Sequence, residues 1–376
     1  MSADQLRFVD RRHIDIEDLR SASADLINLY AQFALPRLWG TGDSAVADGT
    51  QFRTFEDNLP AEQHIRYGKI GGIAYRHIAD NYIALFSYFI ACGHYEAIYI
   101  LDALQKNTSD IRPRRVHADT HGQSATVFGL AYLLGIELMP RIRYWKKLRF
   151  YRPNSQTQYR TIDALFSGTV NWDLIREHCP QFVQLALVIQ SGKLTPSAVL
   201  ARFSSYNARN RFALALQELG KVVRTTFLLQ WIWNEPLRRS VHKCTTKIER
   251  HHQFSKFLCF GGDGLLRTND RADQEKAIVY NELVANAVAL QTVVDQTQAL
   301  HRMHAEGVAF NSDDLALLSP YAPANSSALA TTPPNLSLSH WPAKPFRIRP
   351  AHCHQRKEHE CFQWAMKAPS SASFLD

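Results

Sequence analysis

Three acidic residues occupy positions from which carboxylates could do chemistry: Asp48, Asp119 and Glu249. Asp48 and Asp119 each follow a short apolar run that the sequence predicts to be a strand ending at the acid. A carboxylate at a strand end can project into an active site, although an Asp in this position is also a common turn former or helix cap. Carboxylates suit Mg²⁺, and two ions about 4 Å apart can activate a hydroxyl and stabilise a departing oxygen. The chemistry indicated is phosphodiester cleavage and transfer.

Glu249 is the only acid in the basic stretch 236–257, which is predicted to be helical. None of the residues three or four positions away is Lys or Arg, so an ion pair within the helix does not explain it. These neighbours are Thr245, Thr246, His252 and Gln253. A lone carboxylate among cations stays ionised at neutral pH and can serve as a metal ligand. A salt bridge to another segment is the alternative.

A second basic stretch, residues 139–152, reads MPRIRYWKKLRFYR and contains no acid. Aromatic residues alternate with its cations, and a nucleic-acid surface combines cations for phosphates with aromatic rings for bases. The net charge of +8 also favours an anionic partner, with nucleic acid considered before an acidic membrane surface. The alternative is a strand with solvated lysines. The residues that we expect to contact DNA are Arg141, Arg143, Lys146, Lys147 and Arg149.

The cysteines and the hydropathy of the chain indicate a cytosol-like compartment. The six cysteines are dispersed, without a CxxC pair or a signal peptide, and are expected to be reduced thiols. No apolar run approaches the roughly 18 residues needed to span a bilayer. We therefore expect no membrane partner.

The elements that must position the carboxylates form an α/β arrangement. A hairpin is predicted at 71–92, with its turn at Asp80-Asn81, so the sheet should be mixed. The apolar helix after Asp119 is expected to begin at Ser124 and to end at Gly135. The predicted order is helix 14–35, the Asp48 strand, strands 71–78 and 82–92, helix 94–107, the Asp119 strand, its helix, and strand 136–139.

In the second half of the chain the strand signals fade from residue 151 to 233, and the pattern there is helical. We interpret this part as an insertion, followed by helices at 236–260 and 272–305. After Pro320 the sequence becomes rich in proline, with little apolar periodicity. The predicted division is a helical lead-in (1–40), the first part of a core (41–150), a helical insertion (151–235), the rest of the core with a C-terminal helix (236–320) and a disordered tail (321–376).

From Ile14 to Tyr321 the ordered motifs resemble the C-terminal catalytic region of the Tn-three-family (class II, replicative) transposases. The family's Ser-Asp-Gly motif, followed by an aromatic, is matched by Ala47 to Phe52. Its Thr-Asp-Thr-x-Gly motif is matched by Ala118 to Gly122, with Ala118 as a departure, and its Pro-Arg-Ile-Arg motif by residues 140–143. The third carboxylate stands in an Asn-Lys-x-Glu context. Thr246 to Glu249 is a looser counterpart, with Glu275 and Glu282 as rivals.

The resemblance implies an RNase H-like mixed sheet, interrupted by a large helical insertion between Asp119 and Glu249. It implies that Asp48, Asp119 and Glu249 form a DDE triad holding two Mg²⁺ ions, for which Mn²⁺ can substitute. The implied reaction is cleavage at transposon inverted repeats and strand transfer into target DNA. The implied partner is double-stranded DNA, with a homodimer as an allowed assembly, in the nucleoid of the bacterial cytoplasm.

Two departures from the family pattern suggest that this chain differs from a full-length family member. Family members are longer and carry N-terminal domains that recognise the inverted repeats, and after Tyr321 this chain leaves the family pattern. We hypothesise a truncated remnant with a shifted reading frame at its end. A catalytically inactive DNA-binding remnant is therefore the alternative function, and a structure-specific nuclease of the same fold is a third.

Overall fold

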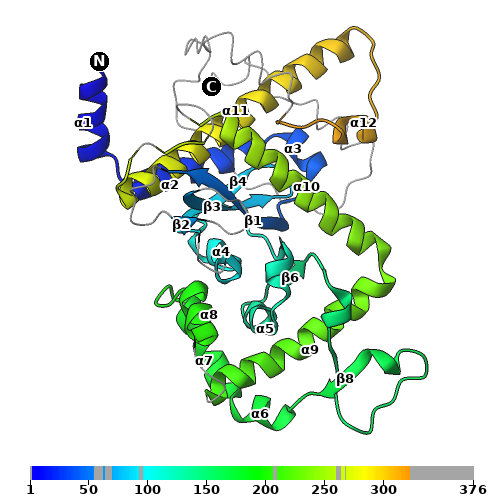
Figure 1. The fold of residues 1–376 in the computed structure, drawn as a ribbon. Helices are drawn as coiled ribbons and strands as arrows, with labels where there is room; N and C mark the ends of the chain where they lie inside the picture. The colour runs from blue at the N-terminus through cyan, green and yellow to red at the C-terminus, as the bar shows by residue number, and fades with distance from the viewer. Residues whose placement is uncertain are drawn as a thin grey trace.

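The computed structural model describes residues 2–54, 62–63, 70–92, 96–205, 210–259, 264–266 and 268–321 (Figure 1). Of the predicted tail, only Tyr321 belongs to these residues, and its side chain is buried in the fold. The disorder predicted for the rest of the tail concerns residues outside the described part.

A mixed sheet of six strands forms the centre of the described fold (Figure 1). The order is β2-β3-β1-β5-β6, and β4 also pairs with β3. Pairing is antiparallel between β1 and β3 and between β3 and β4, but parallel along β1, β5 and β6. This confirms the predicted hairpin and the RNase H-like mixed sheet. The bounds are β1 (Ser44–Arg53), β2 (Glu62–Gln63), β3 (Ile70–Ala79), β4 (Ala84–Ala91), β5 (Arg115–Ala118) and β6 (Glu137–Pro140).

Helices cover both faces of this sheet (Figure 1). One face carries α2 (Ile16–Tyr30), α10 (Glu235–Phe257) and α11 (Arg271–Ala305), and the other carries η1 (Glu96–Tyr99), α4 (Asp102–Lys106) and α5 (Ala125–Leu133). Side chains alternate between the two faces along a strand. Accordingly Val46 packs against Ile248 of α10, whereas Ala47 joins the large core on the α5 side. Asp48 therefore belongs to the face that α10 covers.

Several predicted boundaries need correction. The single helix expected at 94–107 is two short helices, η1 and α4, and the helix expected at 14–35 ends at Tyr30. Pro36 does not end that helix but lies in the first turn of α3 (Ala34–Trp39), where its missing N–H costs nothing. Two further short elements lie at the ends of the described fold, α1 (Ala3–His13) and α12 (Ser312–Ala316).

The insertion begins with a small sheet that the sequence did not predict. Strands β7 (Phe150–Arg152) and β8 (Phe166–Thr169) pair in parallel, next to η3 (Trp145–Lys147) and η4 (Asp163–Leu165). The predicted helices follow. They are α6 (Trp172–Glu177), α7 (Cys179–Gln190), α8 (Pro196–Ser205) and α9 (Arg211–Trp233).

Helix α9 joins the insertion to the core by packing on α5. Their backbones approach at Gly129 and Gly220, where a Cβ on Gly220 would overlap the carbonyl group of Ala125. Only glycine permits this crossing, so the two helices can pack this closely because neither residue has a side chain.

Helix α11 is long and apolar enough to cross a membrane by length and composition. However, 56% of its most apolar window is buried inside the fold, where it packs on α2 and β4. This is the behaviour of a core helix.

Candidate functional site

Asp48 lies on β1, and Asp119 directly follows the neighbouring strand β5. Ala47 of β1 pairs with Ala118 of β5 at the end of a parallel ladder, and the two aspartates are the next residues. Neighbouring strands are about 4.8 Å apart, and paired residues point to the same face. Asp48 is half-buried and the Asp119 side chain is 26% exposed. The register therefore places these two predicted acids at adjacent backbone positions, and solvent reaches both side chains.

Asp48 does not end its strand, contrary to prediction. Strand β1 continues to Arg53 because β3 pairs with it along this whole length, and Arg76 stands opposite Asp48. The backbone N–H of Gly49 donates to Asp48 Oδ1 at 2.8 Å. Asp48 thus projects from the middle of a long strand rather than from a loop, and pairing with β3 holds its backbone in place.

Asp119 has the capping role that the sequence left open as an alternative. It precedes η2 (Thr120–Gln123), and its Oδ1 accepts the backbone N–H of His121 at 2.9 Å. Its Oδ2 lies 3.5 Å from His121 Nε2, on an exposed ring. Arg224 of α9 donates to the carbonyl of Gln123 at 3.2 Å. Local capping and a contact from the insertion therefore fix the loop that carries Asp119.

Glu249 is exposed on α10, the helix that runs over β1. Its neighbour Ile248 packs on Val46, and the ring of His252, one helical turn later, lies beside the backbone of Asp48. At about 100° per residue, Glu249 and His252 share one side of α10, while Lys247 lies on the opposite side, where its ammonium donates to the Trp39 carbonyl at 2.9 Å.

The two rival glutamates have other partners. Glu275 forms a salt bridge with Arg20 at 3.3 Å, while Glu282 is only 5% exposed. Burial raises the pKa of Glu282 to about 7, although the positive charge of Arg76 opposes this shift. A buried carboxyl that resists ionisation is a poor ligand for a metal that must also meet DNA.

Two buried histidines near the aspartates, His117 and His252, are neutral parts of the packing. Burial, helped by the charge of Arg115, lowers the pKa of His117 to about 4. Burial also holds the pKa of His252 well below its usual range, as does the nearby charge of Arg76. The carboxylates are therefore backed by uncharged imidazoles.

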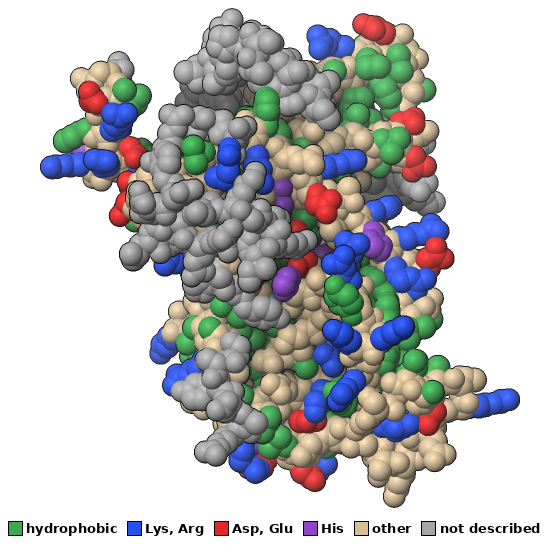
Figure 2. Space-filling model, viewed as in Figure 1, with side chains coloured by type: hydrophobic (Ala, Val, Ile, Leu, Met, Phe, Trp, Pro, Cys, Tyr) green, Lys and Arg blue, Asp and Glu red, His purple; other side chains and the backbone are tan. Residues whose placement is uncertain are grey.

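The basic segment begins directly beside Asp119. The N–H of Arg141 donates to the carbonyl of Ala118 at 2.8 Å, so the chain after β6 leaves the sheet next to the carboxylate. All five predicted DNA contacts are exposed. Figure 2 shows Lys and Arg side chains interleaved with hydrophobic ones on this face. The five are Arg141, Arg143, Lys146, Lys147 and Arg149.

An exposed aromatic pair lies within this segment. Tyr144 is 68% exposed and Trp145 43% exposed. Tyr144 has a positive φ of 56°, a left-handed conformation that a tyrosine rarely adopts. The cations of Arg143 and Lys147 lie 5.9 and 5.6 Å from its ring centre. Cations and a presented ring thus occupy one surface, as binding to unpaired bases requires.

The donor set fits a hard divalent cation, because Asp48, Asp119 and Glu249 all supply carboxylate oxygens and all reach solvent. Within the described ranges, no three His, Cys, Asp or Glu side chains lie close enough to hold a metal ion as they stand. The two aspartates are adjacent by strand register, and the position of the Glu249 carboxylate relative to them stays a prediction.

Sequence reasoning missed the residues beneath this site, among them Arg76, Ser255 and Asn281. All three are at most 1% exposed. One signal was available for Arg76, since a charged residue inside the apolar strand IGGIAYRHIA is unusual. Ser255 and Asn281 carry no such mark, because polar residues in long helices are ordinary.

Comparisons with known proteins identify the family of the chain. The model of the Tn3 transposase DDE domain matches residues 1–327. The transposase for transposon Tn501 of Pseudomonas aeruginosa is 31% identical over 318 residues, which is 84% of this chain and 32% of that protein. The transposase for transposon gamma-delta of Escherichia coli (strain K12) is 27% identical over 318 residues, with the same two shares. The chain spans about a third of the length of the curated relatives it matches.

Proposed function

The chain belongs to the Tn3 transposase DDE-domain family, and from this premise we propose that it is a DNA transposase catalytic region that cleaves phosphodiester bonds at transposon inverted repeats and transfers the strands into target DNA. The observation that carries the proposal is the register of β1 and β5. It makes Asp48 and Asp119 neighbours, with the acid-free basic segment beginning beside Asp119. Anionic ligands and a cationic DNA path are the two parts that this reaction needs.

Asp48, Asp119 and Glu249 are the proposed ligands of two Mg²⁺ ions. Bound Mg²⁺, or Mn²⁺ in its place, would lower the pKa of an attacking hydroxyl and stabilise the departing 3′ oxygen. The contribution of the chain is placement. The ladder holds the two aspartates, and the contact of His252 with the Asp48 backbone supports Glu249, one turn away, as the third ligand.

The substrate is proposed to be double-stranded DNA that loses pairing at the cut. Arg141, whose backbone bonds to Ala118, and Arg143, two residues on, would hold the phosphates beside the scissile bond. Tyr144, presented with cations over its ring, would stack on a base. The three cations that follow would bind the phosphates farther along.

The wider organisation is also a proposal. We assign residues 1–40 to a lead-in, 41–150 and 236–320 to the core, and 151–235 to the insertion, with α9 as its most extensive contact with the core. The bacterial cytoplasm, where DNA substrates reside, is the proposed location. A homodimer is an assembly that sedimentation with bound DNA would test.

The decisive experiment incubates the full chain with inverted-repeat DNA and Mg²⁺ or Mn²⁺, with Asp119→Asn as the reference. Metal-dependent nicks with 3′ hydroxyls at the repeat ends, lost in Asp119→Asn, are expected. Binding without any cleavage would instead identify the alternative, a catalytically inactive DNA-binding remnant. Equal cleavage by wild type and Asp119→Asn would refute the assignment of the metal site.

A further inference from the structure

The Asn281 side chain joins three elements beneath the carboxylates. From α11 its amide group donates to the carbonyl of Ser255 on α10 at 2.9 Å. Its oxygen accepts the Ser255 hydroxyl and also Arg76 Nη2 of β3, the latter at 2.9 Å. In this buried group, Arg76–Asn281–Ser255, one amide N–H and the amide oxygen, which accepts two hydrogen bonds, connect α10, α11 and β3.

The connection bears directly on the proposed site. Arg76 stands opposite Asp48 in the β1–β3 ladder. On α10, Ser255 lies one turn after His252, whose ring lies beside the Asp48 backbone, and Glu249 lies one turn before His252. The half of α10 that carries Glu249 therefore meets the central sheet at two successive turns, through His252 beside β1 and through the Ser255–Asn281–Arg76 bonds to β3.

Burying Arg76 is expensive, so its presence needs an explanation. Its side chain is fully buried, and within the described part of the chain its Nε and Nη1 have no hydrogen-bond partner. Burial lowers its pKa to about 10, partly offset by the charge of Glu282, and the guanidinium lies 5.3 Å from the centre of the Phe52 ring. Well-packed apolar residues often stabilise a core as well as or better than buried ions do. A role in positioning neighbouring elements explains why a charged side chain is kept at Arg76.

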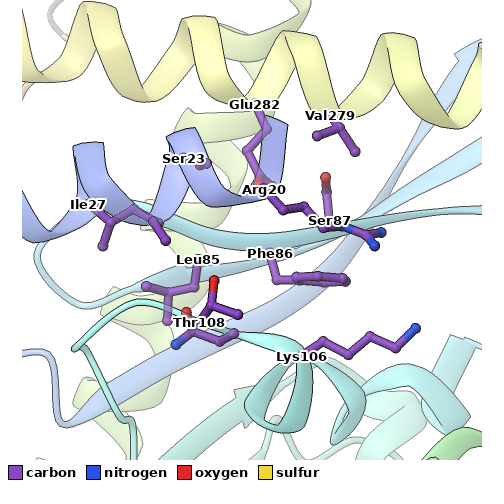
Figure 3. A pocket seen from close by; sticks show the side chains of 12 residues that line it. Arg20, Ser23, Ile27, Leu85, Phe86, Ser87, Lys106, Thr108, Val279 and Glu282 are labelled. Atoms are coloured by element: carbon purple, nitrogen blue, oxygen red, sulfur yellow. The ribbon is translucent and has the colours of Figure 1, made fainter. Parts of the chain in front are cut away.

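The neighbouring pocket is a packed polar contact rather than a binding site. Figure 3 shows Glu282 of α11 directed toward Arg20 of α2 and Ser87 of β4. The cavity volume there is about 10 Å³, which is room for about one water molecule. Glu282 thus serves the packing around Arg76 and does not compete for the role of Glu249.

We propose that Arg76, Asn281 and Ser255 are positioning residues that hold the Glu249 helix against the Asp48 strand and thereby set the metal affinity of the carboxylate site. This inference rests on the proposed function, because that function identifies the carboxylates as metal ligands. None of the three residues contacts the metal. Each acts through the placement of α10.

Helix α11 offers a matched control in Asn286. Like Asn281 it is 1% exposed and makes two bonds to a neighbour, accepting the N–H of Ala84 at 3.0 Å and donating to its carbonyl at 2.9 Å. It holds the start of β4 and contacts Ser23 of α2 at 3.3 Å, but not α10. Asn281→Ala and Asn286→Ala therefore remove similar buried bonds, and only the first frees the Glu249 helix.

The experiment measures Mn²⁺ binding to the full chain by electron paramagnetic resonance, together with thermal unfolding. We expect Asn281→Ala to weaken the binding that depends on Asp119 by about tenfold or more, and Asn286→Ala to change it less than twofold, while both lower the Tm. Ser255→Ala should reproduce the loss and Ser255→Thr, which keeps the hydroxyl, should restore binding. If Asn281→Ala fails to fold, the comparison of Ser255→Ala with Ser255→Thr tests the positioning role.

The outcomes separate the two proposals. Similar Mn²⁺ affinities in Asn281→Ala and Asn286→Ala, with binding still dependent on Asp119, would overturn the positioning role alone. Failure of Ser255→Thr to restore what Ser255→Ala loses would count against it in the same way. Absence of any binding that depends on Asp119 in the wild type would overturn the proposed function, and this inference with it.

Discussion

Asp48 on β1 stands opposite Arg76 on β3, so a half-buried carboxylate and a fully buried guanidinium share one face of the sheet. The carboxylate reaches solvent, while the guanidinium is sealed beneath α10 and α11. The proposed metal ligand and the buried supporting cation are therefore the two members of one residue pair in this ladder. Substitutions at this face should divide into those that abolish reaction and those that shift geometry or stability.

Removing one charge from the aspartate pair should abolish cleavage without unfolding the chain. Asp119→Asn keeps an oxygen that can accept the His121 N–H, so the η2 cap should survive. We expect metal-dependent cleavage to fall by at least about a hundredfold, the scale seen when one charge-stabilising group is removed from an active site. Nicking of inverted-repeat DNA measures it, with Asp110→Asn, an exposed acid elsewhere, as the control. Undiminished cleavage by Asp119→Asn would contradict the prediction.

The third carboxylate can be identified by comparing isosteric variants. Glu249→Gln should reduce cleavage about as strongly as Asp119→Asn, whereas Glu275→Gln should leave it within a fewfold of wild type, because Glu275 forms a salt bridge with Arg20. Single-turnover cleavage at saturating DNA makes the comparison independent of affinity. The assignment of Glu249 is wrong if Glu275→Gln shows the larger loss.

The basic segment should control the salt dependence of DNA binding. The triple variant Lys146→Gln, Lys147→Gln, Arg149→Gln should lower the slope of log K against log salt by about 0.9 for each lost phosphate contact. Fluorescence anisotropy at several salt concentrations measures it. Three exposed cations of the insertion, Arg176, Lys193 and Arg202, changed likewise, form the matched control. Equal slopes in the two triple variants would argue against a specific DNA path.

The α5–α9 crossing should not tolerate a side chain. Gly220→Ala would force apart two helices whose backbones are in contact, which costs about 1–3 kcal/mol, as overpacking generally does. Thermal unfolding should show a lower Tm, while Thr226→Ala on the exposed side of α9 should stay within about 0.5 kcal/mol of wild type. An unchanged Tm for Gly220→Ala would show that the crossing can relax.

Acid should destabilise the fold through buried histidines. Burial lowers the pKa of His77 and of His117 to about 4, whereas a histidine in the unfolded chain titrates near 6.5. Between these values the unfolded chain binds protons that the folded chain excludes, so stability is lost as the pH falls through this window. At pH 5 each histidine lowers the free energy of unfolding by on the order of 2 kcal/mol. Urea unfolding from pH 5 to pH 8 measures it, and a His77→Gln variant should show a weaker dependence.

Glu282 should act in the opposite direction. Its pKa is raised to about 7 by burial, so between about 4.5 and 7 the folded chain holds a proton that the unfolded chain has released, and stability falls as the pH rises. Glu282→Gln should remove this opposing contribution to the pH dependence. The loss of stability below pH 6.5 should therefore be steeper in the variant than in wild type. The same urea series tests it, and a shallower acid dependence in Glu282→Gln would contradict the sign.

Much of the local structure could be derived from the chain alone. Apolar runs and turn residues placed the β3–β4 hairpin and the strands before Asp48 and Asp119, and the acid-free run after β6 marked the basic segment. These features depend on neighbouring residues, whose periodicity and charge can be read along the sequence. The β7–β8 pair was missed because each strand is too short to show a period.

Tertiary structure alone decided which of these pieces meet. The pairing of Ala47 with Ala118, the fully buried Arg76, and the amide of Asn281 between Ser255 and Arg76 join segments far apart in the chain. No local pattern encodes such contacts, because they arise from the register of strands and the packing of helices over them. The sequence by itself determined that the carboxylates and cations exist and which elements carry them. The folded sheet decided that Asp48 and Asp119 are neighbours, with a buried scaffold behind them.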